Sequence, residues 1–318
     1  MDKQDLSVKR KKSVPFSMYD AFTEVPYSGS QAAVVLNASG ITALNRIGIA
    51  REIGAPATAF VNAINHNQIE VQFFSTVMEL PMCGHGTVCL MTELIEQELL
   101  SCRGDGWWEF ILNLPNGEAS VECRRTNTGR VEVMLDVTAA HFAAVKLNFD
   151  ELAGILGIGV GDISRELPLE VATADFTHLC LPMRDLAAMQ ALQPDFSALA
   201  KFCVSNGFET VATFSTEVVD QTCDVHVRDF CPAVGVAESA AAGTTNAALA
   251  TYLLRKSLIT PDTNGLLKVC AEQGVELGRP SRVTTRIEEK GGHIKRLQVG
   301  GMASWVIEGK LNVGLEAL

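Results

Sequence analysis

The chain has 318 residues, of which 47% are apolar and 20% are charged, and its formal net charge is −11. This length favours two domains of roughly 150 residues each, and the composition is typical of a well-packed globular protein. The negative charge disfavours nucleic acid or an anionic membrane as the main partner, and no apolar run reaches the roughly 18 residues of a membrane span.

The N-terminal segment and the cysteines bear on location. Residues 1–12 are polar and lack the apolar core of a signal peptide, so we expect a disordered tail there. Nine cysteines are scattered without a CxxC pair, which disfavours a disulfide framework or a zinc site. The sequence therefore predicts reduced thiols, no bound metal and a cytoplasmic protein.

Strand patterns dominate the first half of the chain. A helix is predicted over 41–54, where the pattern stops at Gly54, and a second over 87–100. Strands are predicted at 13–22, 32–37, 58–64, 69–75, 109–115, 118–126 and 130–137.

The second half repeats this mixture after a crossing segment near 137–145. Helices are predicted over 149–158, over 186–207 as one long or two short segments, and over 243–259, opened by Gly243. Strands are predicted at 177–183, 209–216, 223–232, 266–278, 281–289, 294–301 and 303–311.

The two halves share an internal echo. In the first, the strand "VQFFS" leads into "CGHGT" and a helix; in the second, "VRDFCP" leads through Glu238 into "AGTTN" and a helix. The free N–H groups and positive end of a helix start attract anions. The echo therefore predicts two helix starts that face a shared cleft and hold a carboxylate between them.

Cys83 to Thr87 carry the most reactive side chains. A thiol at a helix start can act as a proton-transfer base, His85 can exchange a hydrogen bond with a ligand, and Gly84 and Gly86 allow a ligand to approach the backbone. The alternative is a buried cysteine beside a glycine-rich helix start. For Thr and Asn at 244–246, the alternative is that they are ordinary helix caps. Arg279 is expected to contact either a carboxylate or its own fold.

Five segments in order resemble the phenazine-biosynthesis isomerase (PhzF-like) family. They are "YDAFTEVPYSGSQAAVVL", "REIGAPATAFV", "FFSTVMELPMCGHGT", "FCPAVGVAESAAAGTTNAALATYL" and "GVELGRPSRV", and the resemblance covers roughly residues 14 to 312. The family is related to diaminopimelate epimerase and proline racemase.

The resemblance implies an α+β fold of two similar lobes, each a curled, mostly antiparallel sheet around a central helix. The first lobe would span 13–140, with about 302–318 returning to it, and the second 141–301. Family members move a proton next to a carboxylate without a cofactor, in a site between the lobes, and homodimers are common.

Not all of the family's site residues are present at the matching positions of this sequence. The family's catalytic glutamate corresponds to Ala57, which suggests extra room. In the second-lobe motif Glu238 is kept, but the aspartate becomes Ser239 and the threonine before glycine becomes Ala242. The "CGH" stretch is intact, and Ser30 stands where the family has Asn.

These replacements remove the usual acid–base group from one face of the expected substrate position. We expect an isomerase or epimerase of a small amino or hydroxy acid, with Cys83 as the base and His85 as a relay. Alternatives are a dehydratase of a hydroxylated amino acid and a catalytically silent carboxylate-binding protein. The expected catalytic residues are Cys83, His85 and Glu238; the expected substrate-binding residues are Ser30, Gly84, Gly86, Thr87, Ser239, Gly243, Thr244 and Thr245.

Overall fold

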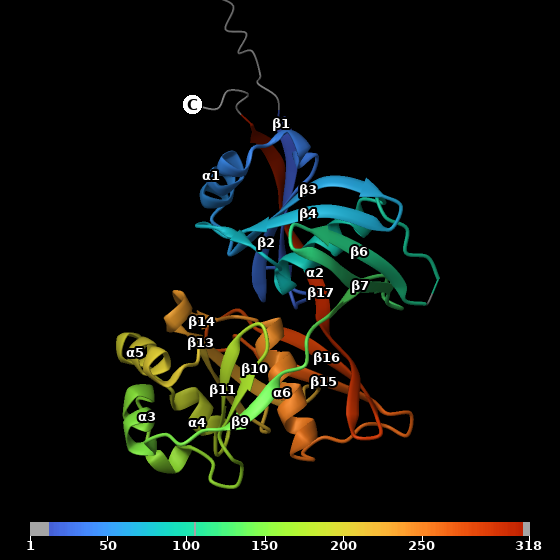
Figure 1. The fold of residues 1–318 in the computed structure, drawn as a ribbon. Helices are drawn as coiled ribbons and strands as arrows, with labels where there is room; N and C mark the ends of the chain where they lie inside the picture. The colour runs from blue at the N-terminus through green and yellow to red at the C-terminus, as the bar shows by residue number, and fades with distance from the viewer. Residues whose placement is uncertain (1–12, 105, 314–318) are drawn as a thin grey trace, which may run out of the picture.

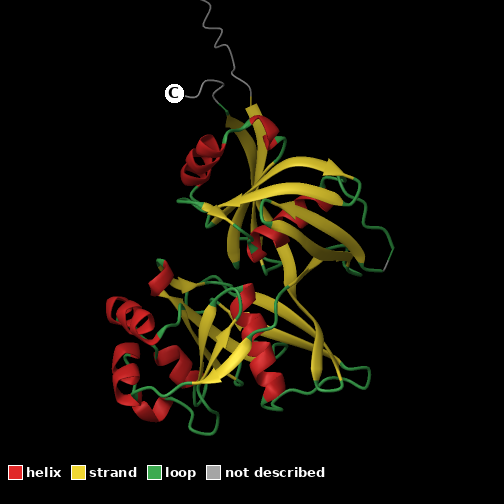
Figure 2. Ribbon diagram, in the orientation of Figure 1, coloured by secondary structure: helices red, strands yellow, loops and turns green. Residues whose placement is uncertain are grey.

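A computed structural model of the chain describes residues 13–104 and 106–313. The predicted N-terminal tail at 1–12 and the last residues, 314–318, lie outside this range. Two lobes follow one another along the chain, and each encloses one central helix within strands (Figures 1 and 2). The predicted α+β class with two curled sheets is confirmed.

The first lobe is a sheet that closes on itself. From β1 the pairing runs through β2, β3, β4, β6, β7 and β8 to β17, which pairs again with β1. The elements are β1 (Ser13–Ala21), β2 (Ser30–Val35), α1 (Ala43–Ile53), β3 (Ala57–Asn65), β4 (Gln68–Phe74), β5 (Glu79–Leu80), α2 (Gly84–Glu96), β6 (Trp108–Leu114), β7 (Gly117–Arg125) and β8 (Val131–Asp136), with a 3₁₀ turn at Ala38–Gly40.

The second lobe likewise curls its strands around a central helix, α6. Its strands pair in the order β9, β10, β11, β12, β13, β15, β16 and β17. The elements are β9 (His141–Ala144), α3 (Phe149–Leu156), β10 (Glu170–Thr173), β11 (Thr177–Pro182), α4 (Leu186–Ala191), α5 (Phe196–Asn206), β12 (Thr210–Ser215), β13 (Val225–Cys231), β14 (Val236–Ser239), α6 (Gly243–Arg255), β15 (Leu266–Gln273), β16 (Ser281–Lys290) and β17 (His293–Asn312), with 3₁₀ turns at Val160–Asp162 and Pro232–Val234.

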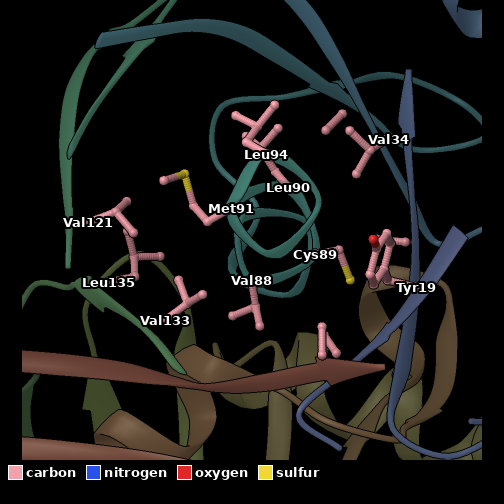
Figure 3. Close-up of a cluster of buried hydrophobic side chains, with 14 of the residues drawn as sticks. Tyr19, Val34, Val88, Cys89, Leu90, Met91, Leu94, Val121, Val133 and Leu135 are labelled. Atoms are coloured by element: carbon pink, nitrogen blue, oxygen red, sulfur yellow. The ribbon is translucent and has the colours of Figure 1, made fainter. Parts of the chain in front are cut away.

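The two central helices are buried on all sides. Residues 86–95 of α2 and 245–253 of α6 are buried, which is the pattern of a helix inside a core. Figure 3 shows Met91 of α2 on the side of Val121, and Leu90 and Leu94 on the side of Val34. The surrounding core therefore holds each central helix in place.

Strand β17 joins the lobes. It pairs with β16 over 293–300, with β8 over 298–302 and with β1 over 303–312. The sequence predicted two strands, 294–301 and 303–311, separated at Met302, but the strand is continuous. A Cβ atom at Gly300 would lie 1.8 Å from the Val133 carbonyl oxygen, so glycine is needed there for β8 to approach.

The region 186–207 forms two short helices, one of the two forms that the sequence predicted. Helix α4 ends at Ala191, and Asp195 caps α5 by accepting from the Ala198 N–H at 3.0 Å. Pro194 lies in the break, because its ring and missing N–H disfavour a continuous helix. Helices α3–α5 pack on the outer face of the second-lobe sheet.

Candidate active site

The start of α2 holds the reactive group that the sequence singled out. Cys83 is the N-cap, and its sulfur accepts a hydrogen bond from the Gly86 N–H at 3.4 Å. A Cβ atom at Gly86 would lie 3.0 Å from this sulfur and 3.0 Å from the Phe73 ring, whereas one at Gly84 would meet nothing within 4 Å. Gly86 thus allows close packing, and Gly84 leaves the backbone open to approach.

Cys83 and His85 form a contacting pair. The sulfur lies 3.5 Å from Nδ1 and 3.6 Å from Nε2 of the imidazole, and His85 is half-buried whereas Cys83 is buried. Burial raises the pKa of the Cys83 thiol to about 12, although the Gly86 N–H opposes the rise. Burial also lowers the pKa of His85 to about 4, so near pH 7 both groups are neutral.

The start of α6 meets the start of α2 at the junction of the lobes. The two helices contact each other, and Ala241 belongs to the same buried cluster as Cys83. Gly243 begins α6, where a Cβ atom would lie 3.2 Å from Val299 of β17. Thr244 is half-buried, and Thr245 is fully buried. The structure thus brings Cys83, His85, Gly243 and Thr244 to one junction.

The internal echo extends to strand pairing. In the first lobe Phe73 lies opposite Leu80, and Phe74 lies opposite Glu79. In the second lobe Asp229 lies opposite Ser239, and Phe230 lies opposite Glu238. Each pair precedes a central helix, so Glu79 and Glu238 occupy equivalent positions.

Glu238 contacts Arg228 rather than the helix starts. Its two carboxylate oxygens each accept a hydrogen bond at 2.9 Å from the guanidinium, and the side chains are only 5% and 8% exposed. Arg228 also donates to the Met189 and Leu192 carbonyls next to α4, and it stacks over Phe230. Glu238 thus forms a buried ion pair on the helix-covered face, and the catalytic role expected from the sequence stays a prediction.

The remaining predicted residues take varied positions. Ser30 and Ser239 are half-buried, whereas Thr87 is fully buried and its hydroxyl has no hydrogen-bond partner in the described chain. Ala57 is also fully buried, within the first-lobe core. The extra room expected beside Ala57 is therefore not open to solvent, because neighbouring core residues cover the methyl group.

Arg279 holds the two lobes together, which was one of the two alternatives drawn from the sequence. Its guanidinium donates to Asp20 at 2.7 Å, to the Gly29 carbonyl at 2.8 Å and to the Ser28 carbonyl at 2.9 Å. These contacts fix the loop that precedes Ser30. The arginine thus supports one edge of the junction from the second lobe.

Sequence reasoning missed two residues of this region, Arg228 and Asp229. Asp229 is buried, and its carboxylate accepts a hydrogen bond from the Thr245 hydroxyl at 3.0 Å. Every residue of β13 is buried, so alternation of apolar and polar residues could not indicate which of these side chains faces α6. The presence of two charged residues in such a strand was the available signal.

Other features lie away from the junction. A surface hollow of about 430 Å³ on the first lobe is lined by Tyr19, Arg130 and Trp305 among others, and it includes none of the predicted site residues. Within residues 13–104 and 106–313, no group of three or more His, Cys, Asp or Glu side chains is placed to hold a metal ion. Over the same residues, no helix has the length and apolar character needed to cross a membrane.

The chain is similar to proteins of one family over most of its length. The family described as phenazine biosynthesis-like protein matches residues 19–309. An uncharacterized isomerase of Deinococcus radiodurans is 29% identical over 91% of this chain and 92% of its own. The trans-2,3-dihydro-3-hydroxyanthranilate isomerase of Pseudomonas chlororaphis is 27% identical over 90% and 95%. The crystal structure of a Bacillus anthracis phenazine biosynthesis protein of the PhzF family superposes with a TM-score of 0.83, at 24% identity and over 95% and 100% of the two chains.

Proposed function

Since the chain belongs to the phenazine biosynthesis-like family, whose curated relatives carry isomerase names, we propose that it shifts a proton on a small carboxylate at the junction of the lobes. The reaction is an isomerisation or epimerisation of an amino or hydroxy acid, and it needs no cofactor. The observation that carries this proposal is the neutral Cys83–His85 pair at the start of α2.

The substrate carboxylate binds at the start of α2. The first turn of this helix contains no acidic residue, and the first N–H groups of a helix have no acceptor within it. Gly84 leaves space beside them. Half-buried His85 lies next to this position, where it can reach a substrate hydrogen.

A bound anion favours His85 over Cys83 as the base. A nearby negative charge stabilises the imidazolium and disfavours the thiolate, so it raises the pKa of both groups. His85 thereby becomes a stronger proton acceptor, while Cys83 keeps its proton and supports the ring. This reverses the roles expected from the sequence. The imidazolium then returns the proton to another carbon, or to the other face, of the same substrate.

Solvent isotope exchange tests the proposal. The full chain in D₂O is incubated with a panel that contains trans-2,3-dihydro-3-hydroxyanthranilate, amino acids and hydroxy acids, and each substrate is followed by NMR and mass spectrometry. We expect deuterium at one carbon of at least one compound. Binding in a thermal-shift screen without deuterium uptake by any of them would instead indicate a silent carboxylate-binding protein.

A further inference from the structure

Asp229 places a carboxyl group on the face of the sheet that carries Ser239. The two residues lie directly opposite each other in antiparallel strands β13 and β14, and directly opposite residues point to the same face. Asp229 is only 2% exposed. The second lobe thus has a carboxyl group one strand away from Ser239, the half-buried residue at the end of β14.

The contacts of Asp229 direct it toward the start of α6. Oδ2 accepts hydrogen bonds from the Thr245 hydroxyl at 3.0 Å and from the Cys231 thiol at 3.4 Å. Thr245 lies in the first turn of α6, and the positive helix end stabilises a nearby carboxylate. Oδ1 is buried and has no hydrogen-bond partner in the described chain. Because such an unpaired oxygen is costly to bury, a purely structural role explains this residue poorly.

The equivalent position in the first lobe carries no charge. Phe73 takes the place of Asp229 in the pairing, and it packs against the position of Gly86, where the second lobe has Thr245. The two helix starts therefore differ: the positive end of α2 is unopposed, whereas a buried carboxyl group offsets the positive end of α6.

The neighbours of Asp229 leave its charge uncompensated. His178, on β11, contacts Thr245 at 3.4 Å, and burial lowers the pKa of this imidazole to about 4, so it is neutral near pH 7. Burial raises the pKa of the Cys231 thiol, which is neutral too. Glu238 on β14 is paired with Arg228. Burial raises the pKa of Asp229 itself to about 6, so it is mostly ionised at pH 7.5.

We propose that Asp229 is a specificity-determining residue that orients the substrate, with its anionic end at the start of α2 and its cationic or uncharged end toward the start of α6. This inference rests on the proposed function. If the two helix starts had equal electrostatic potentials, a substrate could bind with its carboxylate at either of them. The buried charge of Asp229 disfavours the orientation with the carboxylate at the start of α6, so that the reacting carbon lies on a fixed side of His85.

Matched ligands test the orientation. Alanine and lactate share a carbon skeleton and a carboxylate, but only alanine carries an ammonium group. Their dissociation constants are measured by NMR titration at pH 7.5 for the full chain and for Asp229→Asn. We expect the ratio of the lactate constant to the alanine constant to fall by about tenfold in the variant, as for the loss of one unit charge near the ligand in a partly buried site.

Two further variants separate charge from folding. Glu93→Gln is the matched control, because Glu93 is also a buried carboxyl group bound by hydroxyls, those of Ser17 and Tyr19, but belongs to the body of α2. The ratio should stay at the wild-type value in this control. Ser239→Asp adds a carboxyl group opposite Asp229 and should raise the ratio, which tests the inference even if Asp229→Asn folds poorly.

The pH dependence gives an independent readout. Lactate affinity of the wild type should fall as pH rises from 5 to 8, because Asp229 ionises within this range. The fall should be smaller in Asp229→Asn, where only the proton uptake by His85 on carboxylate binding remains. Carboxylate binding with an unchanged ratio and pH profile in Asp229→Asn would overturn the inference alone. If neither these acids nor the wider panel bind to the wild type, the proposed function fails as well.

Discussion

Glu238→Gln separates a structural from a catalytic role for the glutamate of the second-lobe motif. The substitution keeps the size of the side chain but removes its charge. Arg228 would then lose its anionic partner and one of its two hydrogen bonds of 2.9 Å, because the amide keeps a single acceptor oxygen, while the guanidinium remains buried. The expected consequence is a less stable protein with a largely intact reaction.

The contacts of Arg228 set the size of the effect. Breaking a buried ion pair by removing one partner costs about 3–5 kcal/mol. The Met189 and Leu192 carbonyls still accept from Arg228, and a Glu276 oxygen remains 4.0 Å away. We therefore expect the lower end of the range, a loss of about 3 kcal/mol in the free energy of unfolding.

Urea denaturation of the wild type and the variant measures this loss, and Glu79→Gln is the matched control. Glu79 occupies the equivalent position in the first lobe but pairs with the neutral amide of Gln72 at 2.7 Å. The amide oxygen of the new side chain can still accept this bond, so the substitution should cost no more than about 1 kcal/mol. Deuterium exchange by folded Glu238→Gln should stay within about threefold of the wild type. A fall of about a hundredfold with unchanged stability would show that Glu238 is an acid–base group and refute the reasoning.

Three further substitutions probe the junction and the fold. Arg279→Ala removes the interlobe contacts to Asp20, whose carboxylate stays buried, and should lower the free energy of unfolding by about 2–3 kcal/mol in urea titrations; a loss below about 0.5 kcal/mol would contradict the assigned role. Gly86→Ala places a methyl group 3.0 Å from the Cys83 sulfur and should slow deuterium exchange by at least about tenfold, whereas an unchanged rate would mean that the thiol position is unimportant. His226 is fully buried; burial lowers its pKa, but hydrogen bonds to two glutamates outweigh this and raise the pKa to about 9. Its contribution of roughly 3 kcal/mol should be fully present below pH 6.5 and lost as pH rises through 9, and the wild type and His226→Gln should converge in stability there; parallel curves would argue against it.

Much of the fold follows from local patterns. The apolar sequences of α2 and α6 match helices buried on all sides, and the internal echo matches two equivalent strand-to-helix turns. The break predicted at Met302 was wrong because the glycines before it can mark either the end of a strand or a close approach, and only the neighbouring strand distinguishes the two.

The site was less predictable because its partners are set by strand register. The sequence motif groups Glu238 with the start of α6, yet pairing of β13 with β14 turns Glu238 toward Arg228 and leaves Asp229 beside Thr245. A shift of one residue in this register would exchange the two faces. The pairing of Arg279 with Asp20 depends in the same way on contacts across the lobes that no local pattern encodes.

The rate of solvent deuterium uptake by a substrate in His85→Gln, relative to the wild type, tests the central claim most directly. If the neutral imidazole at the start of α2 is the base, the rate should fall by at least about a hundredfold while the variant stays folded and still binds the carboxylate. An undiminished rate in His85→Gln would place the proton transfer on another group and contradict the account.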